Sequence, residues 1–389
     1  MATIVSRASG VSSASAASAV PWDVWCLVAA VTSAMIGVHW DISWHRSIGR
    51  DSFWTPAHLA IHLCGMLAGL ASGYLILSTT LDRESPLRQC SVKIWGFRGP
   101  LGAFIAAWGG LAMIASAPFD NWWHNAYGLD VKILSPPHMV LALGIVGVHA
   151  GALILILGHM NRTAGAAQDR LQWLFLYVGS MIVVCFTVLV MELTFRSLMH
   201  TAGFYRVIAM LVPVVLAGVA RASRLRWAAT IVAGIYSVFT LLMSWILPLF
   251  PAEPKLGPVY YHVTQFVPPE FPLLLIAPAF ALDLIRQRAG TWGAWRQALV
   301  SGVAFVAVFA AAQWPFANFL MSPAARNWFF GAKYFEYFTP PNSLYARNLF
   351  IPAEPPATFA WQAALAVALA IVTTRLGLVW GNWMRRIRR

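Results

Sequence analysis

Long apolar stretches recur along the whole chain and are separated by short polar segments. Most are close to the length of about 20 residues that a helix needs to cross the hydrocarbon core of a bilayer. The pattern therefore predicts an all-α, polytopic bundle of about ten transmembrane helices. We expect these helices near residues 22–40, 56–79, 100–118, 136–158, 171–193, 203–220, 227–249, 271–285, 297–314 and 357–380.

The composition agrees with a membrane protein and excludes a soluble domain. Of the 389 residues, 59% are hydrophobic and only 11% are charged, and the mean hydropathy is +0.66. The 19 Trp and 23 Phe residues are typical of aromatic belts at the two membrane interfaces. The net charge of +13 raises the question of nucleic-acid binding. Because the basic residues lie in loops between apolar stretches, we attribute the charge to membrane topology and predict no nucleic-acid partner.

The positions of the basic residues also predict an orientation. Lys and Arg are concentrated after the second, fourth, sixth, eighth and tenth apolar stretches, which places them on one side if ten helices alternate. Positively charged loops mark the cytoplasmic side. Both termini are therefore expected to be cytoplasmic, and the loops after the first and third helices are expected to face the outer side.

Three regions follow from this pattern, and the third contains two long loops. Residues 1–20 are rich in Ser and Ala and are expected to form a disordered cytoplasmic lead. Residues 21–160 hold four helices and an internal repeat, and residues 161–389 hold about six more. Two outer loops, 251–270 and 315–356, are long enough to form a lid or docking surface, although plain surface connections explain them equally well.

The internal repeat consists of two polar segments, each between two apolar stretches. Both read Asp-x-x-Trp-His, followed by a Gly four residues after the His, an Asp two residues later, and then a hydroxyl residue, Pro, any residue and His. The matched positions are Asp41, Trp44, His45, Gly49, Asp51, Thr55, Pro56 and His58 in the first segment, and Asp120, Trp123, His124, Gly128, Asp130, Ser135, Pro136 and His138 in the second.

The four Cys residues show no CxxC spacing, so neither a disulfide nor a thiolate metal site is predicted.

Each segment is expected to form a metal-binding helical hairpin. Asp41 and His45 are spaced i, i+4 and share one helix face. Thr55 suits an N-cap and Pro56 the first helical position, which puts His58 in the first turn of the next helix. Two imidazoles and one carboxylate suit copper, zinc or iron and leave coordination positions open. A single such His is more often a hydrogen-bonded interface residue, but two matching sets favour six metal ligands: Asp41, His45, His58, Asp120, His124 and His138.

Five further side chains are candidates for orienting these ligands: His62, Asp51, Asp130, His39 and Glu192. His62 lies one helical turn beyond His58, whereas His39 lies on a different helix face from Asp41. Asp51 and Asp130 recur in the repeat and are interpreted as groups that fix the loop or orient a ligand His. Glu192 is expected deep in the fifth helix, where it serves a proton path or the metal site, or pairs with an Arg such as Arg196.

The spacing Asp41-x3-His45-x12-His58 resembles the metal site in the C subunit of the copper membrane monooxygenases, the particulate methane and ammonia monooxygenases. In that subunit a second site reads Asn-x3-His-x13-His, and Asp120-x3-His124-x13-His138 has the same spacing with Asp in place of Asn. The resemblance covers residues 22–160. It implies a copper ion at each set, and activation of O2 to hydroxylate a small or apolar substrate.

The same resemblance implies surroundings and partners. These are a bacterial inner or intracytoplasmic membrane with the metal sites toward the periplasm, an external electron donor such as quinol or a redox protein, and further subunits or a homo-oligomer. The chain departs from the family in having about four extra helices and no cupredoxin part. Asp in place of Asn adds negative charge to the second site, which would allow both sites to be filled at once.

Two other functions remain open from the sequence. A membrane carrier or storage protein for copper or zinc would use the same ligands, but a carrier should string them along a path through the membrane. Here the ligands cluster at one face, and only Glu192 and Asp283 are expected deeper. A non-haem iron oxygenase with two His and one carboxylate changes the metal but not the reaction class.

Overall fold

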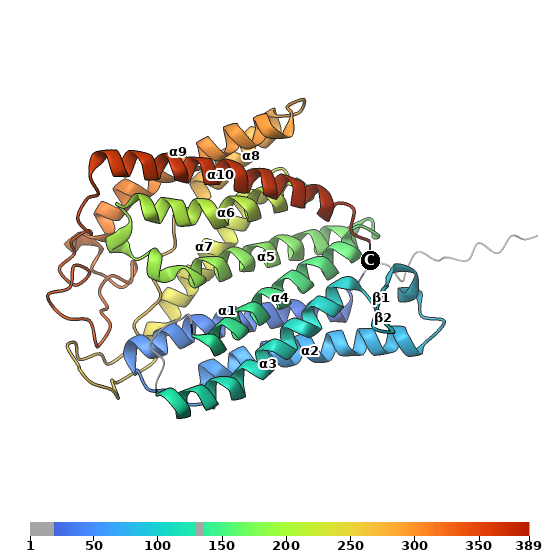
Figure 1. Ribbon diagram of the computed structural model, residues 1–389, viewed down its shortest axis with the longest axis horizontal. Coiled ribbons are helices and arrows are strands. Elements are labelled where there is room, and N and C mark those ends of the chain that lie inside the picture. The colour runs from blue at the N-terminus through green and yellow to red at the C-terminus, as the bar shows by residue number, and fades with distance from the viewer. Residues whose placement is uncertain (1–18, 129–134, 389) are drawn as a thin grey trace, which may run out of the picture.

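The computed structural model describes residues 19–128 and 135–388, which form a bundle of helices with almost no sheet (Figure 1). The disordered lead predicted for residues 1–20 falls almost entirely outside this range. The described helices are α1 (Trp22–Ser47), α2 (Pro56–Leu81), α3 (Leu101–Tyr127), α4 (Pro136–Met160), α5 (Ala166–Leu189), α6 (Ala202–Ala222), α7 (Ala228–Ile246), α8 (Ile276–Arg288), α9 (Ala294–Leu320) and α10 (Pro356–Met384).

Short elements complete the described part of the chain. Strands β1 (Val92–Ile94) and β2 (Phe97–Gly99) form an antiparallel hairpin between α2 and α3. The 3-10 turns are η1 (Pro86–Cys90), η2 (Met191–Leu193), η3 (Arg196–Leu198), η4 (Leu247–Leu249) and η5 (Pro323–Ala325).

Nine of the described helices are long and apolar enough to cross a membrane, which confirms the predicted all-α, polytopic fold. Their outward faces carry large apolar side chains. Leu70 of α2, Leu111 of α3 and Leu143 of α4 are 71%, 54% and 68% exposed. Exposed leucines in such numbers are stable against lipid tails but not against water. The protein is therefore an integral membrane protein.

The eighth predicted helix, 271–285, is the exception. The structure has a helix of only 13 residues there, α8, which spans about 20 Å at the normal helical rise and is shorter than the bilayer core. The chain before it has no regular structure. Two of its backbone N–H groups find partners inside the bundle: the N–H of Leu273 donates to Tyr236 Oη at 3.2 Å, and that of Leu274 donates to Gln313 Oε1 at 2.9 Å. Irregular backbone is tolerated at such depth only when protein supplies these partners.

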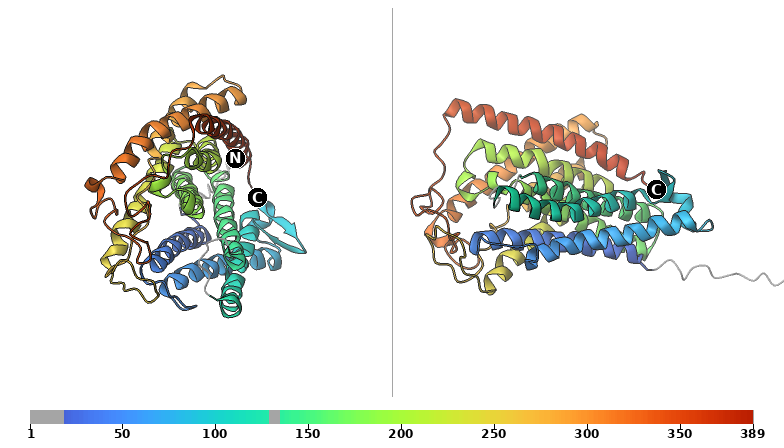
Figure 2. Two further views of the ribbon diagram at one scale, coloured as in Figure 1. Left: turned by 60° about the vertical axis from the view of Figure 1, so that its left-hand side comes forward. Right: turned by 60° about the horizontal axis from the view of Figure 1, so that its bottom comes forward.

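The two ends of the bundle differ (Figures 1 and 2). At one end Asp23, in the first turn of α1, lies 3.5 Å from His159 in the last turn of α4. Asn161 at the same place donates to the carbonyl oxygens of Met384 and Ile387, where α10 ends. We call this the terminal end. The opposite end carries segments 247–275 and 321–355 and is called the loop end.

Helices α3 and α4 approach each other through small residues. A Cβ atom on Gly109 would lie 2.6 Å from Val148 N, and one on Gly144 would lie 2.8 Å from Gly109 O. Both distances are too short for any larger side chain, so the glycines let the two backbones touch. This contact fixes how the end of α3 faces the start of α4, where the second set of candidate ligands lies.

Candidate metal centre

The first candidate site is built where α1 ends and α2 begins, at the loop end. Asp41 and His45 occupy the last two turns of α1. The N–H groups of Ile48 and Gly49 both donate to Trp44 O, and Gly49 adopts φ +85, which reverses the chain. Only glycine adopts this conformation without strain. A short loop then returns the chain to Pro56, the predicted first residue of α2.

The predicted ligands of this hairpin come together. His58 Nε2 lies 3.1 Å from Asp41 Oδ1, and His45 Nε2 lies 3.9 Å from Asp41 Oδ2. His58 is mostly buried, with 18% of its side chain exposed, whereas His45 is 43% exposed. Thr55 occupies the N-cap position of α2, as expected. Its hydroxyl, however, accepts from Ser52 N and so closes the loop instead of capping a helical N–H.

Asp51, which was interpreted from the sequence as fixing the loop or orienting a ligand His, belongs to the same group. Its Oδ2 atom lies 3.3 Å from His45 Nε2 and 3.3 Å from His58 Nε2. Burial raises the pKa of the Asp51 carboxyl, but hydrogen bonds from the two imidazoles outweigh it and hold this pKa well below its usual range. Potential ligand atoms of Asp41, His45 and Asp51 all lie within 4.8 Å of one another.

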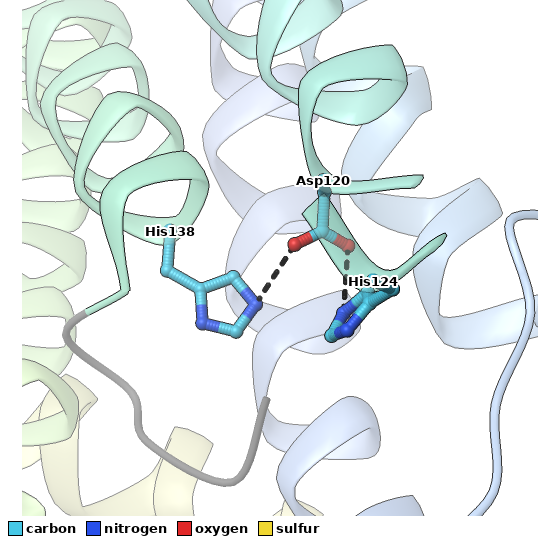
Figure 3. A group of neighbouring side chains, drawn as sticks. All are labelled: Asp120, His124 and His138. Atoms are coloured by element: carbon cyan, nitrogen blue, oxygen red, sulfur yellow. Dashed lines mark ion pairs between the residues drawn. The ribbon is translucent and has the colours of Figure 1, made fainter. Parts of the chain in front are cut away.

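The second candidate site repeats this geometry between α3 and α4 (Figure 3). Asp120 Oδ2 lies 3.4 Å from His124 Nε2, and Asp120 Oδ1 lies 3.4 Å from His138 Nε2. Potential ligand atoms of the three residues again lie within 4.8 Å of one another. Gly128 matches Gly49 in conformation, with φ +91. Asp130, the repeat partner of Asp51, lies outside the described residues.

The orientation of His124 suits metal binding. Its Nδ1 atom lies 3.2 Å from the carbonyl oxygen of Gly128. A carbonyl can only accept, so Nδ1 carries the proton and donates it. This leaves Nε2 as the ring nitrogen that faces Asp120 and that a metal ion would use, which is the orientation that backbone carbonyls impose on metal-binding histidines.

One buried carboxylate oxygen in each hairpin faces an imidazole of the following helix. Asp41 Oδ1 lies 3.1 Å from His58 Nε2, and Asp120 Oδ1 lies 3.4 Å from His138 Nε2. The two oxygens occupy the same position in the repeat. Ligands about 2.1 Å from a tetrahedral ion lie about 3.4 Å apart. The Asp–His separations, 3.1 to 3.9 Å, therefore fit a copper, zinc or iron ion.

The remaining predicted residues divide into near and distant groups. The His62 ring centre lies 6.2 Å from that of His58 and 5.1 Å from that of Phe53, so His62 adjoins the first site. His39 lies away from that site. Its Nδ1 atom donates to Met35 O at 2.8 Å, and its ring lines a separate cavity of about 70 Å³ together with Arg46.

The expectation that Glu192 lies deep in the fifth helix is wrong. Helix α5 ends at Leu189, and Glu192 is exposed in the turn η2 that follows. An exposed carboxylate is solvated and needs no buried partner. The suggested partner Arg196 instead places its guanidinium 4.3 Å from the centre of the Tyr345 ring.

Asp283, the other carboxylate expected at depth, has a structural role. It is fully buried, and its Oδ2 atom accepts hydrogen bonds from Thr230 N at 2.8 Å and Thr230 Oγ1 at 2.9 Å. Its Oδ1 atom accepts from Ala229 N at 3.3 Å and lies 3.6 Å from Arg286 Nε. Asp283 therefore caps the N-terminus of α7 at the terminal end, far along the chain from either hairpin.

Arg46, which directly follows a candidate ligand, was missed by the sequence analysis. It is only 5% exposed, and its Nε atom donates to Glu336 Oε1 at 2.9 Å while Nη1 lies 4.0 Å from Glu270 Oε1. The Arg46 carbonyl also accepts from Tyr337 N. The expected loops 251–270 and 315–356 thus pack onto the end of α1, except that α9 extends to Leu320. The sequence feature that could have identified Arg46 is its position in the last turn of an apolar helix, because a buried Arg there needs a carboxylate partner.

No family model, no curated protein and no solved structure matches this chain.

Proposed function

We propose that this protein is a membrane copper-dependent monooxygenase that activates O2 to hydroxylate a small or apolar substrate. The observation that carries the proposal is the repeated convergence of one Asp and two His at the loop end, with each aspartate facing the Nε2 atoms of its two histidines. A carboxylate and two imidazole nitrogens that face one another can hold a metal ion together. Two such sets at equivalent positions in the repeat support two metal sites.

The chain supplies the ligands and their surroundings. The Gly128 carbonyl fixes the His124 ring, and Asp51 lies between the rings of His45 and His58. Segments 251–270 and 321–355 pack on the end of α1 next to the first site. Copper, when bound, would supply the redox chemistry of oxygen activation.

The substrate and the electrons have to come from outside the chain. Hydroxylation inserts one oxygen atom into a C–H bond and reduces the other to water, which consumes two electrons and two protons. A quinol or a redox protein would provide them. Apolar side chains cover the outward faces of α2, α3 and α4 next to the sites, so an apolar substrate would reach them from the bilayer.

A metal carrier is the less favoured function because of where the candidate ligands lie. Both groups found among the described residues are at the loop end, and the two carboxylates that were expected deeper in the membrane do not extend them into a path. Glu192 is exposed and Asp283 caps α7. A carrier needs successive sites across the membrane.

The first experiment measures metal content and the electron spin resonance spectrum of the full chain in lipid nanodiscs. Wild type is compared with His45→Ala, with His124→Ala and with the control His262→Ala, which removes an exposed His outside both sites. We expect one copper equivalent to be lost in each site variant and none in the control. O2 uptake with a quinol donor and a panel of apolar substrates then tests catalysis.

Each alternative gives a distinct result. Iron in place of copper would favour a non-haem oxygenase. Copper or zinc that binds without substrate-dependent O2 uptake would favour a carrier or storage protein. No bound metal in wild type would overturn the proposal and leave the hairpins as a structural repeat.

A further inference from the structure

A second cavity at the loop end lies between helices that carry no candidate metal ligand. Its volume is about 490 Å³, within the range of sites that bind small organic molecules. Its walls come from the turn that precedes α6, from α9, from the end of segment 321–355 and from the first turn of α10. The side chains that carry the argument are His200, Trp314, Phe350, Glu354 and Phe359.

Aromatic rings form the wall of this cavity. The His200 ring is stacked between Phe350, at 3.6 Å between ring centres, and Trp314, at 4.1 Å. Phe359 meets Trp314 edge to face at 5.9 Å. Stacking on two sides fixes the rings, so the wall is in place before any ligand arrives. Aromatic faces attract cations through the ring quadrupole.

The histidine in this wall carries no positive charge that would repel a cation. Its Nε2 atom lies 3.2 Å from Trp314 O, so it carries a proton and donates to that carbonyl. His200 lies between α5 and α6, outside the membrane-spanning helices, and burial lowers the pKa of its imidazole. The ring is therefore neutral at neutral pH.

The one acidic side chain among the residues that line the cavity indicates the charge of its ligand. Glu354 lies in the chain just before α10, and its Oε2 atom is buried without a hydrogen-bond partner in the described residues. A buried carboxylate oxygen without a donor is costly, and a ligand that supplies positive charge would remove the cost. The rings and the carboxylate thus favour the same kind of ligand.

We infer that this cavity binds an organic ammonium group, with Glu354 as its counter-ion and the Trp314, Phe350 and Phe359 rings around its methyl or methylene groups. The cavity lies at the start of α10, where a membrane-spanning helix meets the interface. The ammonium group can therefore come from a lipid headgroup or from a soluble amine. This site is independent of the proposed metal chemistry.

The test uses the full chain in nanodiscs of phosphatidylglycerol, whose headgroup has no ammonium. Butyltrimethylammonium is titrated by calorimetry against wild type, Glu354→Gln, Phe359→Leu and the control Glu253→Gln, which neutralises an exposed carboxylate on another loop of the same end. We expect about tenfold weaker binding in the first two variants and unchanged binding in the control. Circular dichroism and size-exclusion profiles show which variants are folded.

A second experiment with another lipid distinguishes a lipid headgroup from a soluble amine as the ligand of the cavity. If lipid headgroups fill the site, phosphatidylcholine nanodiscs will abolish binding of the soluble probe, and native mass spectrometry will find phosphatidylcholine retained by wild type but not by Glu354→Gln. If soluble amines fill it, probe affinity will be the same in both lipids. Equal affinity for the neutral isostere, in which carbon replaces nitrogen, or equal binding by folded Glu354→Gln, would overturn the inference. So would a wild type that binds neither probe nor lipid.

Discussion

Arg46 Nε donates to Glu336 Oε1 across 2.9 Å and so joins the last turn of α1 to segment 321–355. Tyr345 in the same segment donates to Glu270 Oε1 at 2.9 Å, and Glu270 in turn lies 4.0 Å from Arg46. The residue before Arg46 is the candidate ligand His45. One helical turn therefore carries both a proposed metal ligand and the anchor of the long loop, so the packing of the loop and the geometry of the first site are expected to be coupled.

The first prediction concerns this anchor. Glu336→Gln keeps the shape of the side chain but removes the charge closest to a guanidinium that is 5% exposed. Breaking one partner of a buried ion pair costs about 3 kcal/mol or more, and the low end applies because Glu270 remains. We expect faster limited proteolysis within 321–355 and a lower free energy of unfolding in detergent titrations. Glu253→Gln is the matched control. Proteolysis at the wild-type rate would mean that the ion pair does not hold the loop.

The second prediction concerns Asp51. Its carboxylate contacts both imidazoles of the first site and belongs to a different hairpin from the ligands of the second site. Asp51→Asn should weaken copper binding at the first site by about 10-fold to 100-fold and leave the second site unchanged. Competition with a chelator of known affinity measures both sites. Asp169→Asn, on the exposed start of α5, is the control. Equal weakening at both sites, or none, would contradict a role for Asp51 in the first site.

Most of the fold could be predicted from the sequence because membrane-spanning helices are encoded by length and hydropathy alone. The eighth crossing could not. The run Phe271–Ile276 is as apolar as a helix, and Pro272 does not by itself exclude one. Its irregular backbone is stable only because Tyr236 and Gln313, which lie on other helices, supply hydrogen bonds. Such partners are a tertiary property that a hydropathy pattern does not contain.

The candidate site likewise has a part that the sequence predicts and a part that depends on tertiary contacts. Asp41, His45 and His58 converge as predicted because helical periodicity and the Thr-Pro helix start determine their directions. The contact of Asp51 depends on the path of a short loop that Gly49 reverses, so the spacing alone could not assign it. Glu192 was misplaced because an apolar stretch continues past the residue where α5 ends.

The third prediction uses the glycines of the repeat as a matched pair. A Cβ atom on Gly49 would overlap Tyr337 Oη, whereas one on Gly128 would meet no described atom within 4 Å. Both residues have positive φ, so Ala costs about 1 to 2 kcal/mol of backbone strain at either position. Gly49→Ala should in addition displace segment 321–355 from the first site, and proteolysis of that segment should accelerate. Equal proteolysis in the two variants would show that Tyr337 moves aside without cost.

The last prediction concerns Asp283 and tests whether its carboxylate has a structural role or a role in metal binding. Asp283→Ala removes the acceptors for Thr230 N, Thr230 Oγ1 and Ala229 N, and leaves Arg286 without its nearby carboxylate. Loss of an N-cap costs about 1 to 2 kcal/mol, and the unpaired donors add to it. We therefore expect a lower unfolding midpoint in detergent titrations.

Copper content should not change in Asp283→Ala, because the cap lies at the terminal end and both candidate sites lie at the loop end. Elemental analysis of folded protein at a temperature below the unfolding transition tests this. His45→Ala provides the opposite pattern, with copper lost from one site. A folded Asp283→Ala protein that lost copper would mean that this buried carboxylate does belong to a metal path through the membrane, and the carrier function would then be favoured.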